Sequence, residues 1–114
     1  MSESDEQACL VRWFDMQYPK YSGLLFAIPN GGARTKSYGA RLKREGMRAG
    51  VPDLMLPIAS DEYHGLFIEL KTKKGKLQDS QKIWLQKLND NGYLAAECKG
   101  WEAAKELIQQ YLGR

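Results

Sequence analysis

Three ionisable residues, Asp53, Glu69 and Lys71, have the types and the spacing of a site that holds a divalent cation against an anionic substrate. Asp53 follows a proline at the entrance of one apolar run, and Glu69 and Lys71 lie two residues apart inside another. Side chains two apart on a strand share a face, so Glu69 and Lys71 should point the same way. Two neighbouring carboxylates repel each other unless a cation lies between them. Because these ligands are oxygens, with no Cys or His among them, the expected cation is Mg²⁺ or Mn²⁺.

A purely structural explanation of the Glu-x-Lys pair competes with the metal site. A solvated edge strand can carry Glu69 and Lys71 on its outward face, joined by a salt bridge, and the tripeptide is common. The Pro52-Asp53 pair lies only a short hairpin upstream, at the mouth of a second apolar run. That second carboxylate favours the metal site.

The elements that must position these residues follow from apolar periodicity and turn signals. Helices are expected at about 4–18, 37–46, 79–89 and 101–112, and strands at 22–28, 53–58, 65–71 and 93–98. Ser4 and Gln7 resemble a capping box for the first helix. The second and third strands should form a hairpin across residues 59–64, which brings Asp53 to the face of Glu69. The order of elements indicates an α/β fold in which helices flank a small mixed β-sheet.

Two further polar residues could join this face. Glu6 lies on the inward side of the first helix, although Glu3 competes with it and the helix dipole alone favours acids in a first turn. Gln81 lies on the inward edge of the third helix, in its first turn, where it is a core-rim amide or a ligand for a phosphate or water near Lys71. Gln78 replaces the small capping residue expected before that helix, which leaves the start of the helix uncertain.

Basic residues flank the carboxylates in the sequence. The chain has 114 residues and a net charge of +3, and residues 34–76 hold ten basic against five acidic residues. This distribution suits a polyanion, although a solvated basic helix is the simpler alternative. Glycines 31 and 32, beside Arg34, could let backbone N–H groups approach a phosphate. The candidate DNA contacts are Arg34, Lys36, Arg41, Arg44, Lys73 and Lys74.

Length and composition narrow the class of protein. A chain of 114 residues fits one domain, 1–114, and leaves no second domain for reading a base sequence. It has no apolar run long enough for a membrane span, and its acidic start is unlike a signal peptide, so a soluble cytoplasmic protein without membrane partners is expected. Cys9 and Cys98 are too far apart for a zinc motif and are expected to be buried thiols. His64 is expected to be a loop residue.

These motifs resemble those of the PD-(D/E)XK nuclease superfamily: GVPDL at 50–54, IELK at 68–71, and Gln81 on the following helix. The whole chain, including PNGG at 29–32 and Gly92-Tyr93, resembles the VRR-NUC family of virus-type replication-repair nucleases. The resemblance implies a restriction-endonuclease-like core and Mg²⁺- or Mn²⁺-dependent hydrolysis of DNA phosphodiesters. For stand-alone phage and bacterial members it further implies homodimers that act on branched DNA, such as the four-way (Holliday) junctions of repair and recombination.

By position, the resemblance makes Asp53 and Glu69 metal ligands, together with the Leu70 carbonyl. It makes Lys71 the catalytic lysine and Gln81 the glutamine that follows it, and it matches Glu6 to the acid of the first helix. The resulting expectation is a structure-specific DNA endonuclease that resolves four-way junctions as a homodimer. The alternatives are a non-specific or flap- and nick-directed nuclease, a non-catalytic DNA-binding module, and a small structural protein with a basic face.

Overall fold

The computed structural model describes residues 1–29 and 35–113. Their helices are α1 (Glu3–Gln17), the short 3-10 helix η1 (Pro19–Tyr21), α2 (Lys36–Arg44), α3 (Asp79–Asp90) and α4 (Trp101–Leu112). Their strands are β1 (Phe26–Ala27), β2 (Leu54–Leu56), β3 (Leu66–Lys71) and β4 (Leu94–Lys99). Every helix within these residues is too short or too polar to cross a membrane.

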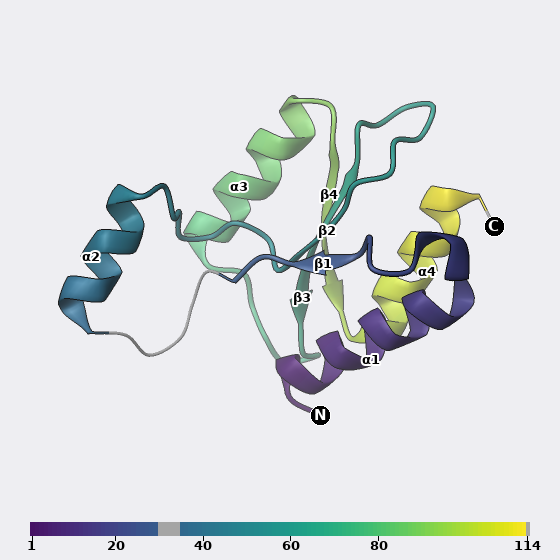
Figure 1. The fold of residues 1–114 in the computed structure, drawn as a ribbon, viewed down its shortest axis with the longest axis horizontal. Helices are drawn as coiled ribbons and strands as arrows, with labels where there is room; N and C mark the ends of the chain where they lie inside the picture. Colours follow the sequence, from purple (N-terminus) through teal and green to yellow (C-terminus); the bar gives the residue numbers. More distant parts are fainter. Residues whose placement is uncertain (30–34, 114) are drawn as a thin grey trace.

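The four strands form one mixed sheet in the order β1-β2-β3-β4, as Figure 1 shows. β1 and β2 pair antiparallel, β2 and β3 form the expected antiparallel hairpin, and β3 and β4 are parallel. The parallel pair needs a crossover connection, which α3 supplies. The predicted α/β class with a mixed sheet is therefore confirmed.

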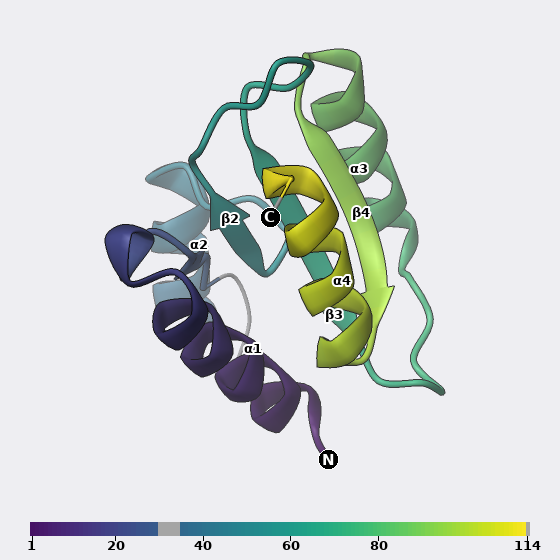
Figure 2. The same ribbon diagram turned by 90° about the vertical axis from the view of Figure 1, so that its right-hand side faces the viewer.

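Helices cover both faces of the sheet. α1 and α4 pack against each other on one face, and α3 lies along β4 on the other (Figure 2). The hydrophobic core lies between the sheet and the helices α1 and α4. It includes Leu10 and Phe14 of α1, Ile68 of β3 and Ile108 of α4. β3 is buried along its whole length and has a neighbouring strand on each side. It is not the solvated edge strand that the structural explanation of Glu69 and Lys71 required.

Several boundaries differ from the sequence prediction. β1 is much shorter than 22–28, because a 3-10 turn begins at Pro19 and Gly23 adopts a positive φ of 86°. The capping box of α1 is formed by Ser2 and Asp5 rather than by Ser4 and Gln7, since the helix already begins at Glu3. Both cysteines are free thiols, but only Cys98 is buried.

α2 stands apart from the sheet and the other helices (Figure 1). It contains no buried residue, and its Tyr38 is 48% exposed. Leu42 and Met47 are half-buried and line a shallow hollow with Tyr38 and Pro29. Tyr38 and Leu42 thus line this hollow and are not part of the hydrophobic core.

Candidate active site

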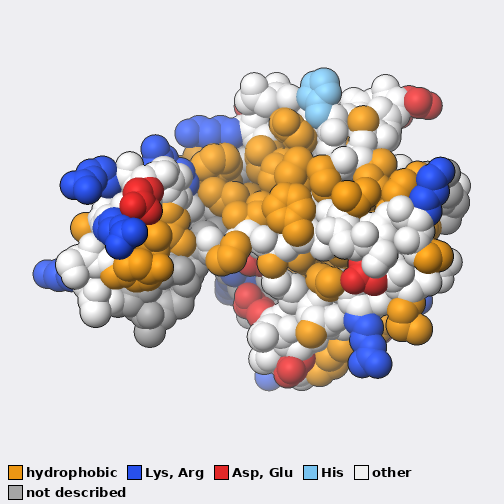
Figure 3. All heavy atoms as spheres, in the orientation of Figure 1, with side chains coloured by type: hydrophobic (Ala, Val, Ile, Leu, Met, Phe, Trp, Pro, Cys, Tyr) orange, Lys and Arg blue, Asp and Glu red, His pale blue; other side chains and the backbone are white. Residues whose placement is uncertain are grey.

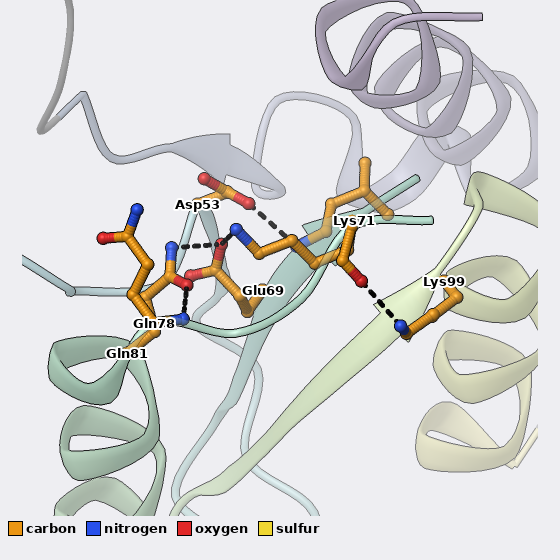
Figure 4. Close-up of polar contacts among 8 residues, drawn as sticks. Asp53, Glu69, Lys71, Gln78, Gln81 and Lys99 are labelled. Atoms are coloured by element: carbon orange, nitrogen blue, oxygen red, sulfur yellow. Dashed lines mark hydrogen bonds and ion pairs between the residues drawn. The ribbon is translucent and has the colours of Figure 1, made fainter. Parts of the chain in front are cut away.

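The β2–β3 hairpin brings Asp53 and Glu69 together. Leu54 pairs with Ile68, so Asp53, one residue before β2, comes opposite Glu69. The Glu69 and Lys71 side chains lie on the face opposite the core and are nevertheless buried, with 1% and 7% of their surface exposed. Figure 4 shows both side chains directed toward Asp53 and the start of α3. The structure therefore gathers the three residues that the sequence singled out.

The Pro-Asp sequence changes how β3 is paired next to Glu69. Ladder hydrogen bonds recur at every second residue, so continuing the β2–β3 register would pair Leu70 with Pro52. Proline has no N–H, and therefore cannot donate a ladder hydrogen bond to the Leu70 carbonyl. The Leu70 N–H instead donates to Asp53 Oδ2 at 2.8 Å. N–H and C=O of one strand residue point to the same side, so the Leu70 carbonyl faces Asp53 as well.

Glu69 has unequal surroundings at its two carboxylate oxygens. Oε2 accepts a hydrogen bond from Gln81 Nε2 at 3.3 Å and lies 3.9 Å from Lys71 Nζ. Oε1 is buried and has no hydrogen-bond partner in the described protein. An unpartnered buried carboxylate oxygen destabilises a fold, and such atoms commonly mark a functional site or the place of an ion.

The pKa of Glu69 is raised from 4.5 to about 8. Burial is the largest cause, and the nearby negative charge of Asp53 follows. The charge of Lys71 lowers this pKa only in part, and the charge of Glu3 raises it further. Near neutral pH, the metal-free site therefore favours a proton on Glu69.

The residues present fit a hard divalent cation. The described residues contain no cluster of three or more His, Cys, Asp or Glu that could hold a metal. Asp53, Glu69 and the Leu70 carbonyl form a smaller, all-oxygen set, which suits Mg²⁺ because this ion keeps several waters and uses one or two carboxylates. A cation bound here would replace the proton on Glu69 and relieve the repulsion between the two carboxylates.

Gln81 joins this site through both ends of its amide. Its Oε1 accepts from the Gln78 backbone N–H at 2.8 Å, while its Nε2 donates to Glu69. The first contact caps α3, which begins at Asp79 as expected although Gln78 is not a small residue. Gln81 thus ties the start of α3 to Glu69, and neither a phosphate nor a water is needed to explain its position.

Of the two candidate acids on the first helix, Glu3 is the one whose charge acts on Glu69. Its charge contributes to the raised pKa of Glu69. Glu6 Oε2 instead accepts a hydrogen bond from the Trp101 N–H at the start of α4. Both acids lie on one stripe of α1, three residues apart, so helical spacing could not separate them. The contact of Glu6 is with α4 rather than with Asp53 and Glu69.

The candidate DNA contacts fall into two groups. Lys36, Arg41 and Arg44 are exposed on α2, where Arg41 forms an ion pair with Glu45 at 3.1 Å. Figure 3 shows Lys and Arg side chains gathered on this lobe, while apolar side chains gather on the part of the main body next to it. Lys73 and Lys74 are exposed in the loop after β3. Glycines 31 and 32 and Arg34 lie outside the described residues.

His64 and Lys99 lie outside the set formed by Asp53, Glu69 and Lys71. His64 lies in the β2–β3 loop and packs edge-on against Tyr93, as a loop residue should. Lys99, which the sequence did not single out, is the β4 partner of Lys71, and its Nζ donates to the Gly75 carbonyl at 2.6 Å. Only the parallel register of β3 and β4 reveals that these two lysines are neighbours.

Comparisons with known proteins agree over nearly the whole chain. The family model for the VRR-NUC domain matches residues 1–102. A solved structure named "VRR_NUC domain protein" is 31% identical, covers 99% of this chain and 89% of its own, and superposes with a TM-score of 0.88. Another, named "VRR_NUC domain", is 17% identical over 93% of this chain and 97% of its own, with a TM-score of 0.59, and shows the fold alone. No curated protein matches the chain.

Proposed function

Because the chain belongs to the VRR-NUC domain family, we propose that it is an endonuclease. It would hydrolyse DNA phosphodiester bonds and depend on Mg²⁺ or Mn²⁺. Membership makes it a nuclease-type domain. The observation that carries the metal dependence is the buried Glu69 carboxylate, which faces Asp53 and has an oxygen without a partner. Buried carboxylates in that state need a proton or a cation, and a cation at this place would polarise the phosphate of a bound DNA strand.

Each residue has a distinct part in this chemistry. When bound, the cation polarises the scissile phosphate and lowers the pKa of a water. Asp53, Glu69 and the Leu70 carbonyl would hold it, and Glu69 must release its proton first. Lys71, beside Glu69, orients the attacking water as a cation and stabilises negative charge that develops on the phosphate oxygens. A neutral Lys71 acting as general base is the alternative role. Gln81 holds Glu69 in place.

Within this class, we propose that the substrate is branched DNA, four-way junctions above all, and that two copies act together. The support is the resemblance of the motifs to those of stand-alone family members. Two copies related by a two-fold axis would place two active sites on the two strands that must be cut in a junction.

Cleavage of a panel of labelled DNAs tests the proposal. The panel contains four-way junction, nicked, flap and linear duplexes, each incubated with Mg²⁺, Mn²⁺ or EDTA. We expect metal-dependent cutting, strongest on the junction, and a loss of about a hundredfold or more in Asp53→Asn and Lys71→Ala. Asn is chosen because its carbonyl can still accept from the Leu70 N–H. Lys87→Gln, on the exposed surface of α3, is the control.

The outcomes separate the alternatives. Cleavage by either site variant at the wild-type rate would remove the site assignment, and cleavage in EDTA would remove the metal. Equal cutting of linear duplex would favour a non-specific nuclease, and preferred cutting of flap or nicked DNA would change the substrate. DNA binding without cutting under any condition would leave a non-catalytic module.

Metal binding can be measured without any cleavage. A ligand at a hundred times its Kd stabilises a fold by about 2.7 kcal/mol. Thermal melting with and without Mg²⁺ should therefore show a rise in Tm for the wild type, and calorimetry should show proton release at neutral pH. Both signals should be lost in Asp53→Asn and kept in Lys87→Gln. An unchanged Tm in the wild type would contradict the metal site and favour a purely structural protein.

A further inference from the structure

We propose that the cavity at the carboxyl ends of β3 and β4, lined by Lys73, Lys74 and Lys99, binds a DNA backbone phosphate next to the one that is cut. This inference rests on the proposed function, because it names how the same substrate is held. It adds a binding site that lies beyond the residues of the catalytic set.

The cavity has the size and the charge for a phosphate group. Its volume is about 570 Å³, and its lining includes the three lysines and two acids, Glu6 and Glu102. Glu6 is already engaged with the Trp101 N–H, and Glu102 is exposed in the first turn of α4. No ion pair within the described residues neutralises any of the three lysines. Lysine ammonium groups without carboxylate partners are suited to bind phosphate as point charges.

The residues that line the cavity are neighbours of Lys71 in the sheet and in the sequence. Lys99 pairs with Lys71 in the β3–β4 register, and Lys73 and Lys74 follow Lys71 by two and three residues. A DNA strand carries one charge per about 3.4 Å of helix axis. When one phosphate of a DNA strand lies at Lys71, the next phosphate of that strand is therefore close enough for the lysines of the cavity to contact it.

The loop that carries Lys73 and Lys74 is fixed relative to Lys71. Its turn is closed by a hydrogen bond from the Gly75 N–H to the Thr72 carbonyl at 3.0 Å. A Cβ on Gly75 would lie 3.4 Å from the Lys71 side chain, so the loop folds back over the Lys71 stem. Lys99 secures this arrangement through its hydrogen bond to the Gly75 carbonyl, shown in Figure 4. Lys99 is therefore a positioning residue as well as a source of charge.

Neutral phosphates test the cavity directly. A series of DNA substrates carries one methylphosphonate at each position flanking the cleavage site. We expect one of these substitutions to lower cleavage by the wild type about tenfold. In Lys73→Gln/Lys74→Gln and in Lys99→Gln, the same substitution should have no additional effect, because the interaction is already lost. Lys87→Gln should respond to the methylphosphonates as the wild type does. If the methylphosphonate lowers cleavage by the lysine variants by the same factor as it lowers cleavage by the wild type, the cavity does not hold that phosphate.

Binding in EDTA keeps the inference testable even if no DNA is cut. The slope of log Kd against log salt concentration should fall by about one for each lysine that contacts a phosphate. An unchanged slope in Lys73→Gln/Lys74→Gln, with the native melting temperature, would overturn the phosphate site. Failure of the wild type to cut any DNA would instead refute the proposed function, whatever the slopes show.

Discussion

Glu69 is the residue whose surroundings favour its ionised form least. Its carboxylate is buried, one oxygen lacks a partner, and Asp53 adds a second negative charge. A buried group in this state lowers the stability of the metal-free protein. A bound cation would reverse the sign of that contribution, so metal binding and folding should be coupled here.

The metal-free protein should lose stability as pH rises from about 4.5 to about 8. Across this window the unfolded chain has released the Glu69 proton and the folded chain still holds it, so raising the pH favours unfolding. The effect should be on the order of a few kcal/mol. Urea denaturation in EDTA at several pH values measures it. Glu69→Gln should show a flatter profile, and identical profiles for the two proteins would contradict the raised pKa.

The sequence predicted Asp53, Glu69 and Lys71 because spacing by two on a strand and a short hairpin leave little freedom. Gln81 could also be placed, since its position in the first turn of α3 fixes its direction. Glu3 and Glu6 could not be distinguished, because the packing of α1 decides which of two acids on one stripe reaches Glu69. Lys99 was missed, since pairing of parallel strands across a helix leaves no local signal.

At the scale of elements, the loop before β2 and the start of α3 are held at a fixed distance. Gly50 has a positive φ of 91°, and a Cβ there would lie 2.6 Å from the backbone of Ser80. Only glycine permits this contact. Gly50 precedes Asp53 by three residues and Ser80 precedes Gln81 by one, so this contact helps to assemble the site although Gly50 has no side chain.

Gly50→Ala should therefore destabilise the fold and weaken the site. We expect a loss of about 1 to 3 kcal/mol in unfolding free energy from the unfavourable φ alone, with displacement of α3 in addition. Chemical denaturation and DNA cleavage measure the two effects. Gly39→Ala is the matched control: nothing lies within 4 Å of its Cβ position, and in a helix Ala is favoured by up to about 1 kcal/mol. Equal stability of the two variants would show that the Gly50 contact is unimportant.

Helices and the β2–β3 hairpin were predictable, because apolar spacing and turn residues determine them locally. β1 was predicted too long: the strand holds only Phe26 and Ala27, and Leu24 lies before it with 39% of its surface exposed. The direction in which a short apolar run leaves the sheet depends on tertiary contacts. The same limit applies to α2, which contains no buried residue.

At the scale of the whole molecule, charge and apolar surface occupy different places. Basic side chains lie on α2 and in the loop after β3. Figure 3 shows apolar side chains gathered on the main body of the molecule beside the α2 lobe. Two separate basic regions on one chain suit DNA that reaches the active site from more than one direction, as the arms of a junction do.

If two copies act together, sedimentation in the absence of DNA should give a mass twice the 13.0 kDa of one chain. Two active sites in one particle should also cut both strands of a junction before release. Mixing the wild type with inactive Lys71→Ala should then yield junctions nicked in one strand only. A single chain in sedimentation at concentrations where the junction is cut, with no singly nicked product on mixing, would exclude the homodimer.

Asp53 has one consequence for how such a protein can change over evolutionary time. Its side chain completes the pairing of β3 where Pro52 interrupts it, so the residue serves architecture and chemistry at once. The side chain of Lys71 makes no comparable hydrogen bond to the backbone of the described residues. A lineage that no longer needed to cut DNA would be free to lose the lysine first, whereas discarding the aspartate would leave an amide inside the protein without an acceptor. In relatives of this chain, an aspartate at this position is therefore weak evidence for catalytic activity, and a lysine at the position of Lys71 is stronger evidence.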